Sequence, residues 1–219
     1  QKSVEESTTI VSQIGIAPII EILDRKADVI VCGRACDTAI YAAPCIYNGY
    51  NPGLAFHMAK IMECGAMCSE PVAAADVMQA YMYDDYFELR PANPIRKCTV
   101  DRVAAHTLYE QSNPYLIFEP DGVCDLTNSQ FSQVDERTVR VSGSVFREAE
   151  VKTLKLAGAK CSGYRTICPA TVCDPETVRR FDFIAETVLN FVKENTKNTL
   201  PADSYSITFK TNGGPESSF

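Results

Sequence analysis

The stretch Asp28-Val29-Ile30-Val31-Cys32-Gly33-Arg34-Ala35-Cys36-Asp37 decides which fold the sequence predicts. Its residues 28–32 form a short apolar run without polar alternation, which is typical of a parallel strand buried on both faces. Gly33 ends the run, and the carboxylate of Asp37 can cap a following helix. Residues 18–44 are therefore predicted to form a helix, a strand, a turn and a second helix, the repeating unit of an α/β layer.

The pattern of the sequence changes after Glu70-Pro71. Apolar residues at helical spacing predict helices over residues 18–26, 52–68, 99–108 and 175–195. Alternating or aromatic-rich runs predict strands within residues 77–89, 131–156, 164–172 and 205–210. The predicted fold class is therefore α/β, with a parallel α/β layer in the first third followed by an α+β region with antiparallel or mixed strands. Three parts follow from this: residues 1–75 as the C-terminal portion of a sheet domain, 76–200 as the α+β region, and 201–219 as a last strand and flexible tail.

Composition excludes several classes of protein. The 219 residues carry 21 Lys and Arg against 28 Asp and Glu, a formal net charge of −7, and 46% are hydrophobic, so the chain is not a disordered one. No block of Lys or Arg indicates a nucleic-acid or anionic-membrane surface. The apolar stretches fall short of the roughly 20 residues of a membrane helix. The ten cysteines lack zinc-site spacing, which favours reduced thiols in a cytoplasmic protein without a metal site.

The turn after the predicted strand is the first candidate site. Ligands of open α/β sheets bind beyond the carboxyl ends of the strands. Gly33 permits conformations closed to other residues, Arg34 offers a planar fork for a carboxylate or phosphate, and the amides of the next helix favour the same kind of anion. Gly33, Arg34 and Asp37 are therefore substrate-binding candidates. The alternative is an ordinary turn in which Arg34 pairs with Asp37 or a neighbour.

His106 is the first candidate for acid/base catalysis, since histidine titrates near neutral pH. Arg102 and Glu110 lie four residues before and after it, which places all three on one face of a helix, with Tyr109 beside them. A carboxylate one turn from an imidazole can orient it and raise its basicity. His106, Tyr109 and Glu110 are thus catalytic candidates, and Arg102 is a substrate-binding candidate. The alternative is a solvated ladder of charges on an exposed helix face.

His57 is the second choice for a catalytic histidine. It borders the apolar stripe of its predicted helix, so the alternative is a structural histidine at the edge of the core. The loop that starts at Asn113 directly follows the His106 helix, and loops on a rigid scaffold often border sites. Asn113 is therefore a further substrate-binding candidate, against the alternative that this loop contains only a plain turn at 120–122. The H-E-x-x-H and G-x-S-x-G motifs are missing, which disfavours hydrolases of those kinds.

Several blocks of the sequence resemble the acyclic terpene utilisation (AtuA) family. They are residues 13–15, 27–39, 52–66, 104–115, 139–144 and 163–166. The block Ala104-Ala105-His106-Thr107-Leu108-Tyr109-Glu110 is quite specific, and the resemblance runs from about residue 10 to 190. It implies that roughly the first half of the family's main α/β domain is missing. We therefore expect a piece of a longer polypeptide, in agreement with a start at Gln1 inside a helical-looking segment.

Family members occur in the degradation of acyclic terpenes and other branched carboxylic acids, often beside a small ferredoxin-fold protein or domain. We therefore predict a catabolic enzyme of the lyase or hydratase type acting on a branched carboxylate or acyl-CoA. Arg34 and the helix amides would hold the anion, and His106, assisted by Glu110, would move the proton. A homo-oligomer is expected, and the sequence identifies no cofactor.

The alternative to an enzyme is a non-enzymatic scaffold subunit that presents its β region to a ferredoxin-fold partner. The positions of Arg34 and His106 separate the two hypotheses. If both side chains open into one pocket, the enzyme is favoured; if they lie on separate surfaces, the scaffold is.

Overall fold

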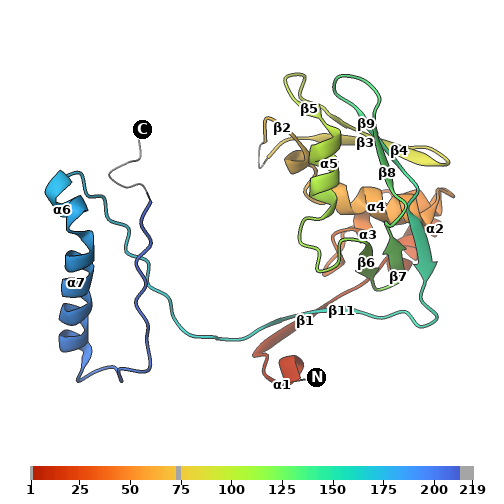
Figure 1. The fold of residues 1–219 in the computed structure, drawn as a ribbon. Coiled ribbons are helices and arrows are strands. Elements are labelled where there is room, and N and C mark those ends of the chain that lie inside the picture. The colour runs from red at the N-terminus through yellow and green to blue at the C-terminus, as the bar shows by residue number, and fades with distance from the viewer. Residues whose placement is uncertain (1, 73–74, 213–219) are drawn as a thin grey trace. The chain divides into compact units, whose positions relative to one another are not determined.

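The computed structural model describes residues 2–72 and 75–212. It contains two compact units, one ending at Cys161 and one beginning at Ser162, and each is described by itself. Figure 1 shows the elements of both. The first unit combines helices with antiparallel sheets, which confirms the mixed α/β class. Residues 213–219 of the predicted tail lie outside the described residues.

The first unit contains most of the regular structure. Its helices are α1 (Lys2–Glu5), α2 (Ala17–Asp24), α3 (Ala39–Tyr47), α4 (Pro52–Met62), the 3₁₀ helix η1 (Gly65–Cys68) and α5 (Val100–Thr107). Its strands are β1 (Thr9–Gln13), β2 (Ser69–Glu70), β3 (Met78–Met82), β4 (Tyr86–Pro91), β5 (Lys97–Cys98), β6 (Leu116–Glu119), β7 (Gly122–Asp125), β8 (Gln130–Gln133), β9 (Val139–Ser142), β10 (Val145–Glu148) and β11 (Lys155–Ala159). The second unit holds α6 (Pro175–Arg179) and α7 (Phe181–Thr196).

The ladders between the described strands are antiparallel. The largest sheet has the order β3-β4-β9-β8, a second has the order β10-β7-β6, and β2-β5 and β1-β11 form pairs. Strand β9 shows the predicted alternation, because Val139 and Val141 are buried while Arg140 between them is not. Val141 pairs with the buried Phe87 of β4, so this face of the sheet forms part of the core.

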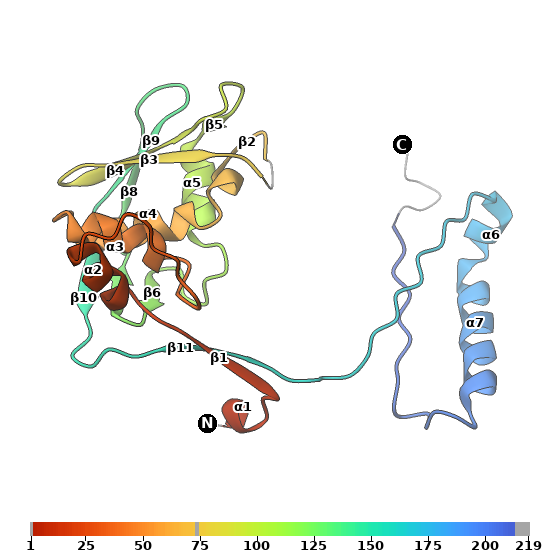
Figure 2. The same ribbon diagram turned by 180° about the vertical axis from the view of Figure 1, so that it is seen from behind.

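Helix α4 lies at the centre of the first unit. Its N-terminus is capped by Asn51, whose Oδ1 accepts a hydrogen bond from the Gly53 amide at 2.8 Å. All residues from Gly53 to Ile61 are buried. One side of the helix packs with α2, α3 and the β6-β7 sheet through Ala55, Phe56 and Ala59. The other side packs against the four-stranded sheet through Leu54, Met58 and Ile61, and Figures 1 and 2 show α4 between these layers.

The prediction of a parallel strand at residues 28–32 is wrong. It forms no ladder with the strands that the structure describes, and the parallel contact in this region is an isolated bridge between Ile14 and Ala35. Ile30 and Cys32 pack against the core as expected, but Val29 and Val31 are 80% and 91% exposed. The apolar run thus has one covered face and one open face, because within the described chain no neighbouring strand completes the layer.

Several element boundaries also differ from the prediction. The helix expected over 52–68 ends at Met62 and is followed by η1, and the helix expected over 175–195 is interrupted at Arg180, whose backbone is not helical. The strands expected at 164–172 and 205–210 form no ladder, since no described strand pairs with them. Asp174 does cap α6, through a 2.7 Å bond to the Thr177 amide. Asp37 does not cap α3, whose N-cap residue is Thr38.

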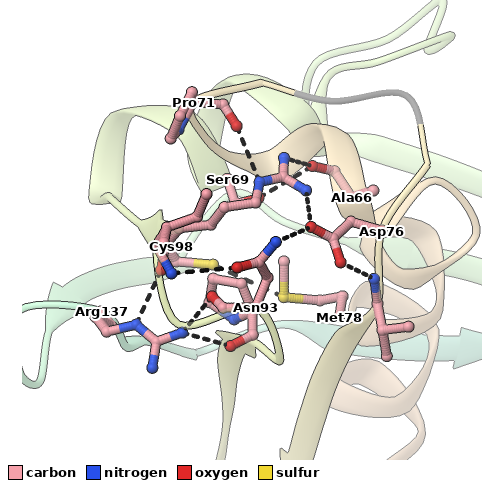
Figure 3. A network of polar contacts seen from close by, with 12 residues as sticks. Ala66, Ser69, Pro71, Asp76, Met78, Asn93, Cys98 and Arg137 are labelled. Carbon is pink, nitrogen blue, oxygen red and sulfur yellow. Dashed lines mark hydrogen bonds and ion pairs between the residues drawn. The ribbon is translucent and has the colours of Figure 1, made fainter.

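Hydrogen bonds from two arginines stabilise the loops around β2 and β5 (Figure 3). Arg96 is buried and donates hydrogen bonds to the carbonyls of Pro71 and Ala66, at 2.9 and 2.7 Å, and to the Asp76 carboxylate at 2.9 Å. Arg137 donates to three further backbone carbonyls. Because these charged donors are well satisfied, the network holds loops that lack regular secondary structure.

The approach of Gly15 to Asp121 gives a test of the fold. Asp121 is buried, and its Oδ2 accepts a 2.8 Å hydrogen bond from the Ile16 amide. A Cβ at Gly15 would lie 1.9 Å from that oxygen. We expect Gly15→Ala to lower the free energy of unfolding by about 1–3 kcal/mol, the cost of displacing a buried charged acceptor. Urea denaturation of the purified chain measures this loss.

Gly33→Ala is the matched control. Nothing lies within 4 Å of a Cβ at Gly33, and its φ is not positive, which corrects the expectation that this position needs glycine. We expect a change within about 0.5 kcal/mol. Equal losses for the two variants would contradict the role given to the contact with Asp121.

Candidate functional site

A pocket of about 270 Å³ lies between the start of α3, the end of α4, the loop after α5, and strands β6 and β11. Apolar walls are provided by Ile117 and Phe118 of β6. Its polar lining consists of Asp37, Thr38, Lys60, Glu63, Glu110, Gln111, Ser112, Glu119 and Lys155. The pocket therefore collects ionisable groups from segments that are distant in the sequence.

Lys60 and Glu63 form an ion pair in the wall of the pocket. Lys60 is 4% exposed because the burial of α4 places its side chain inside the unit, and its Nζ also lies 5.8 Å from the centre of the Tyr109 ring. Burial raises the pKa of Glu63, while the Lys60 charge and hydrogen bond act in the opposite direction. The pair thus keeps two charges at a site where water has limited access.

Glu119, at the end of β6, has a carboxyl group whose pKa lies far above its ordinary value. Burial raises the pKa of Glu119 to about 7, and the charges of Glu63 and Asp121 add to this rise. The Thr38 hydroxyl and the Lys155 charge lower the pKa, but by less than burial raises it. Near neutral pH, Glu119 is therefore divided between its carboxylate and carboxylic acid forms, which suits a group that both takes and returns a proton.

Thr38 adds a buried hydroxyl. Its side chain is close enough to Glu119 to affect that pKa, yet its Oγ1 makes no hydrogen bond of normal geometry with any residue that the structure describes. Buried hydroxyl groups nearly always have a partner. The neighbouring Cys36 thiol is also buried, and desolvation raises its pKa to about 11, so it is not a thiolate at neutral pH.

The match to a family of known proteins is broad. The family model described as "Acyclic terpene utilisation family protein AtuA" matches residues 1–84 and 91–216. The chain belongs to the acyclic terpene utilisation family. No similar curated protein and no similar solved structure was found. The resemblance seen in the sequence is thereby confirmed.

Two residues named from the sequence line the pocket of this AtuA chain. Asp37 and Glu110 are both exposed at its rim. Tyr109 touches the wall through its contact with Lys60, and the adjacent Glu110 raises the pKa of its hydroxyl. Gly33 and Arg34 are exposed and do not line the pocket, so the predicted anion site at this turn is not joined to it.

The predicted charge ladder around His106 is wrong. Helix α5 ends at Thr107, and Glu110 has a φ of 56°, so Glu110 does not lie one turn along the same face. His106 is 6% exposed rather than solvated, and it stacks on Tyr109 with 5.4 Å between the ring centres. Burial lowers the pKa of His106, and the nearby Lys60 charge lowers it further. His106 thus lies next to residues of the pocket wall without lining the pocket.

Arg102 and Asn113 also have local structural contacts. Arg102 lies 3.8 Å from the Glu70 carboxylate, a weak and exposed ion pair on the side of α5. Asn113 Oδ1 accepts hydrogen bonds from the amides of Tyr115 and Leu116, at 2.9 and 3.1 Å, and so shapes the loop before β6. Neither residue lines the pocket.

His57 is completely buried rather than at the border of the core, because α4 is covered on both sides. The Thr107 hydroxyl donates to the Val103 carbonyl at 3.1 Å, so at 3.0 Å it must accept from His57 Nε2. Nδ1 is then the acceptor for the Ser144 hydroxyl at 2.7 Å. His57 is therefore held as a neutral imidazole in one tautomer, and burial lowers its pKa to about 3.

Sequence reasoning missed Lys60, Thr38 and Glu119 as site residues. A lysine inside an apolar helix stripe, three residues before a glutamate, is a usable signal for a buried ion pair. Glu119 gave a weaker signal, because it precedes the turn Pro120-Asp121-Gly122 and is typical of a loop border. Its burial depends on α3 and β11, which are distant in the sequence.

Within residues 2–72 and 75–212, no group of three or more His, Cys, Asp and Glu side chains has the arrangement of a metal site. Of the helices in these ranges, none combines the length and the apolar character needed to cross a bilayer.

The environment of His57 predicts a pH dependence of stability. Between pH 6.5, the ordinary pKa, and about 3, the unfolded chain binds a proton at this histidine and the folded chain does not. The contribution of this group to the free energy of unfolding should therefore fall as the pH falls below about 6.5, with a slope approaching 1.4 kcal/mol per pH unit, while the raised pKa of Glu119 acts in the opposite direction over part of this range. Chemical denaturation at pH 7.5, 6.5 and 5.5 measures the slope.

The variant His57→Gln supplies the comparison. The amide of this variant can form the same two hydrogen bonds but does not titrate. We therefore expect its free energy of unfolding to be lower than that of the wild type at pH 7.5 and to rise less steeply with pH. The slope that remains in the variant combines the lowered pKa of His106, which acts in the same direction as His57, with the raised pKa of Glu119, which acts in the opposite direction. Identical slopes in the wild type and the variant would refute the assignment of the effect to His57.

Proposed function

We propose that this AtuA-family chain carries an acid/base site, of the lyase or hydratase type, for a branched carboxylate or acyl thioester. The observation that supports this most strongly is a glutamate with a pKa of about 7 in a pocket that also holds a buried lysine. A catabolic role is proposed from the family, whose name refers to the use of acyclic terpenes. A cytoplasmic location is proposed from the ten cysteines, all of which are free.

The proposed step is a proton transfer next to a carbonyl group. The Glu119 carboxylate takes a proton from the carbon beside the carbonyl or, in a 2-enoyl substrate, from the γ carbon that is conjugated with the carbonyl. The electron pair of the broken C–H bond forms a carbon–carbon double bond, and the carbonyl π electrons move to oxygen. The Glu119 carboxylic acid then returns a proton to the same carbon or to a conjugated one. This enolate step is common to the elimination and addition of water or carbon fragments beside a carbonyl.

The proposed roles differ from those predicted from the sequence. We assign the proton transfer to Glu119 because it lines the pocket, whereas His106 lies behind Tyr109. Arg34 is retained only as an exposed anion contact outside the pocket, and His57 is fully engaged in the core. His106 keeps a proposed supporting role, since it stacks on the ring that contacts Lys60.

Exchange in D₂O tests the proton transfer without knowledge of the complete reaction. The purified chain is incubated with 3-methylbut-2-enoyl-CoA or the saturated analogue, and NMR follows the entry of deuterium next to the carbonyl or at the conjugated position. We expect exchange above the background rate. Glu119→Gln should reduce it by about 10²–10⁴-fold, because the amide cannot carry the proton.

Glu21→Gln is the control for this experiment, since Glu21 is exposed on α2 and does not line the pocket. His106→Gln is compared in parallel, and we expect a smaller loss than for Glu119→Gln. Undiminished exchange in the Glu119 variant would rule out its role as acid/base, and a larger loss at His106 would return the role to the histidine.

The pH dependence of the exchange is a separate prediction. The base form of Glu119 grows as the pH rises through its pKa of about 7, so the exchange rate should rise from pH 6 to pH 8 and level off above. A rate measurement on the wild-type chain from about pH 4 to pH 9 locates the midpoint. A midpoint near 4.5, the ordinary value for glutamate, would contradict the assignment.

A scaffold subunit remains the second candidate. It is supported by one observation, that Arg34 and His106 do not open together into the pocket. In this case the chain binds a small ferredoxin-fold protein, and the substitution Glu119→Gln leaves both the binding and any activity of the complex unchanged. A homo-oligomer is compatible with either candidate, and sedimentation analysis of the purified chain tests it.

A further inference from the structure

The charges that line the pocket restrict the chemistry of its ligand. Lys60 is already paired with Glu63. The other charged groups that the structure describes in the lining are Asp37, Glu110, Glu119 and the exposed Lys155. Even with Glu119 protonated, acidic groups outnumber the free cation. A ligand that brings a further carboxylate into this space is therefore repelled.

The pocket nevertheless offers hydrogen-bond donors. Thr38 is 4% exposed, and its hydroxyl makes no hydrogen bond of normal geometry within the described residues. Lys60 has three N–H donors, and its hydrogen bond to a described residue is the one to Glu63. Both side chains line the pocket together with Glu119. A hydroxyl without an acceptor of normal geometry, beside an ammonium group with N–H donors beyond its bond to Glu63, is suited to a neutral oxygen acceptor in a space that disfavours anions.

We propose that the Thr38 hydroxyl and the Lys60 ammonium group bind the carbonyl oxygen of a neutral acyl thioester, and that the pocket rejects the corresponding free carboxylate. This inference rests on the proposed function and narrows its substrate class. The thioester carbonyl lies beside Glu119, which takes the proton from the neighbouring carbon. As the carbonyl oxygen gains negative charge, its hydrogen bonds to Thr38 and Lys60 become stronger.

The ion pair of Lys60 and Glu63 then makes the pocket selective for a neutral carbonyl oxygen over a free carboxylate. An unpaired ammonium group in the wall would attract any anion, including a free carboxylate. Pairing with Glu63 neutralises the charge over a distance but leaves N–H donors available at close range. A carbonyl oxygen that becomes an enolate oxygen gains from such donors, because its charge develops only during the reaction.

A pair of uncharged and charged probes tests the inference. The neutral probe is the N-acetylcysteamine thioester of 3-methylbut-2-enoic acid, and the charged probe is the free acid. Titration of the full chain at pH 7.5, followed by NMR or calorimetry, gives both affinities. We expect the thioester to bind at least about tenfold more tightly, as one avoided like-charge contact in a partly buried site would give. Equal or tighter binding of the acid overturns the inference, and so does a lack of thioester binding at millimolar concentration.

Thr38→Val separates ligand binding from a structural role. The hydroxyl has no hydrogen-bond partner of normal geometry to lose, and it does not cap α3 by a side-chain bond, so the melting temperature should stay the same or rise. Affinity for the thioester should fall by about two- to tenfold, the equivalent of one hydrogen bond. Thr9→Val, at an exposed position of β1 outside the pocket, should change neither. Unchanged affinity in the Thr38 variant overturns the proposed contact.

The double variant Lys60→Met, Glu63→Met tests the second donor without leaving a buried charge unpaired. It should weaken thioester binding further, with the melting temperature serving as the check on folding. The proposed reaction and the proposed ligand contacts can be refuted separately. Thioester binding that depends on Thr38 without Glu119-dependent exchange removes the proposed reaction alone. Exchange that depends on Glu119 without any effect of Thr38 or Lys60 removes this inference alone.

Discussion

The burial of helix α4 between two hydrophobic clusters is the constraint on which the first unit depends. Because both sides of the helix are covered, its polar side chains must find partners inside the protein. His57 meets this requirement through two hydroxyl groups, and Lys60 meets it through Glu63. The first arrangement has every ring nitrogen satisfied. The second lies at the end of the helix, where the packing opens into the pocket.

The same packing determines the chemistry of the pocket. Strand β6 brings Glu119 against the start of α3, and the loss of water around its carboxyl group raises the pKa. The charge of Lys155 is too exposed to reverse this effect. Desolvation therefore places a carboxyl group with a pKa near neutral pH in the pocket, while both histidines of the chain are buried and have lowered pKa values.

Local patterns in the sequence predicted the elements that depend on local physics. The helix from Pro52, the alternation of Val139 and Val141 and the Asp174 cap are all present. The strand predicted at 28–32 is not formed, because a strand needs a hydrogen-bonded neighbour and a local sequence pattern does not show whether one is present. Of the site residues named from the sequence, Asp37 and Glu110 line the pocket and their roles stay predictions, whereas the environment of Glu119 comes from burial by distant segments.

Direct titration of Glu119 tests the central claim, that packing around the pocket creates a carboxyl group poised for proton transfer. The chain is labelled with glutamate carrying ¹³C in the side-chain carboxyl group, and the signal is assigned by its loss in the Glu119→Gln variant. The account predicts that this signal titrates with a pKa of about 7. A signal that titrates at about 4.3, like an exposed glutamate, would contradict it.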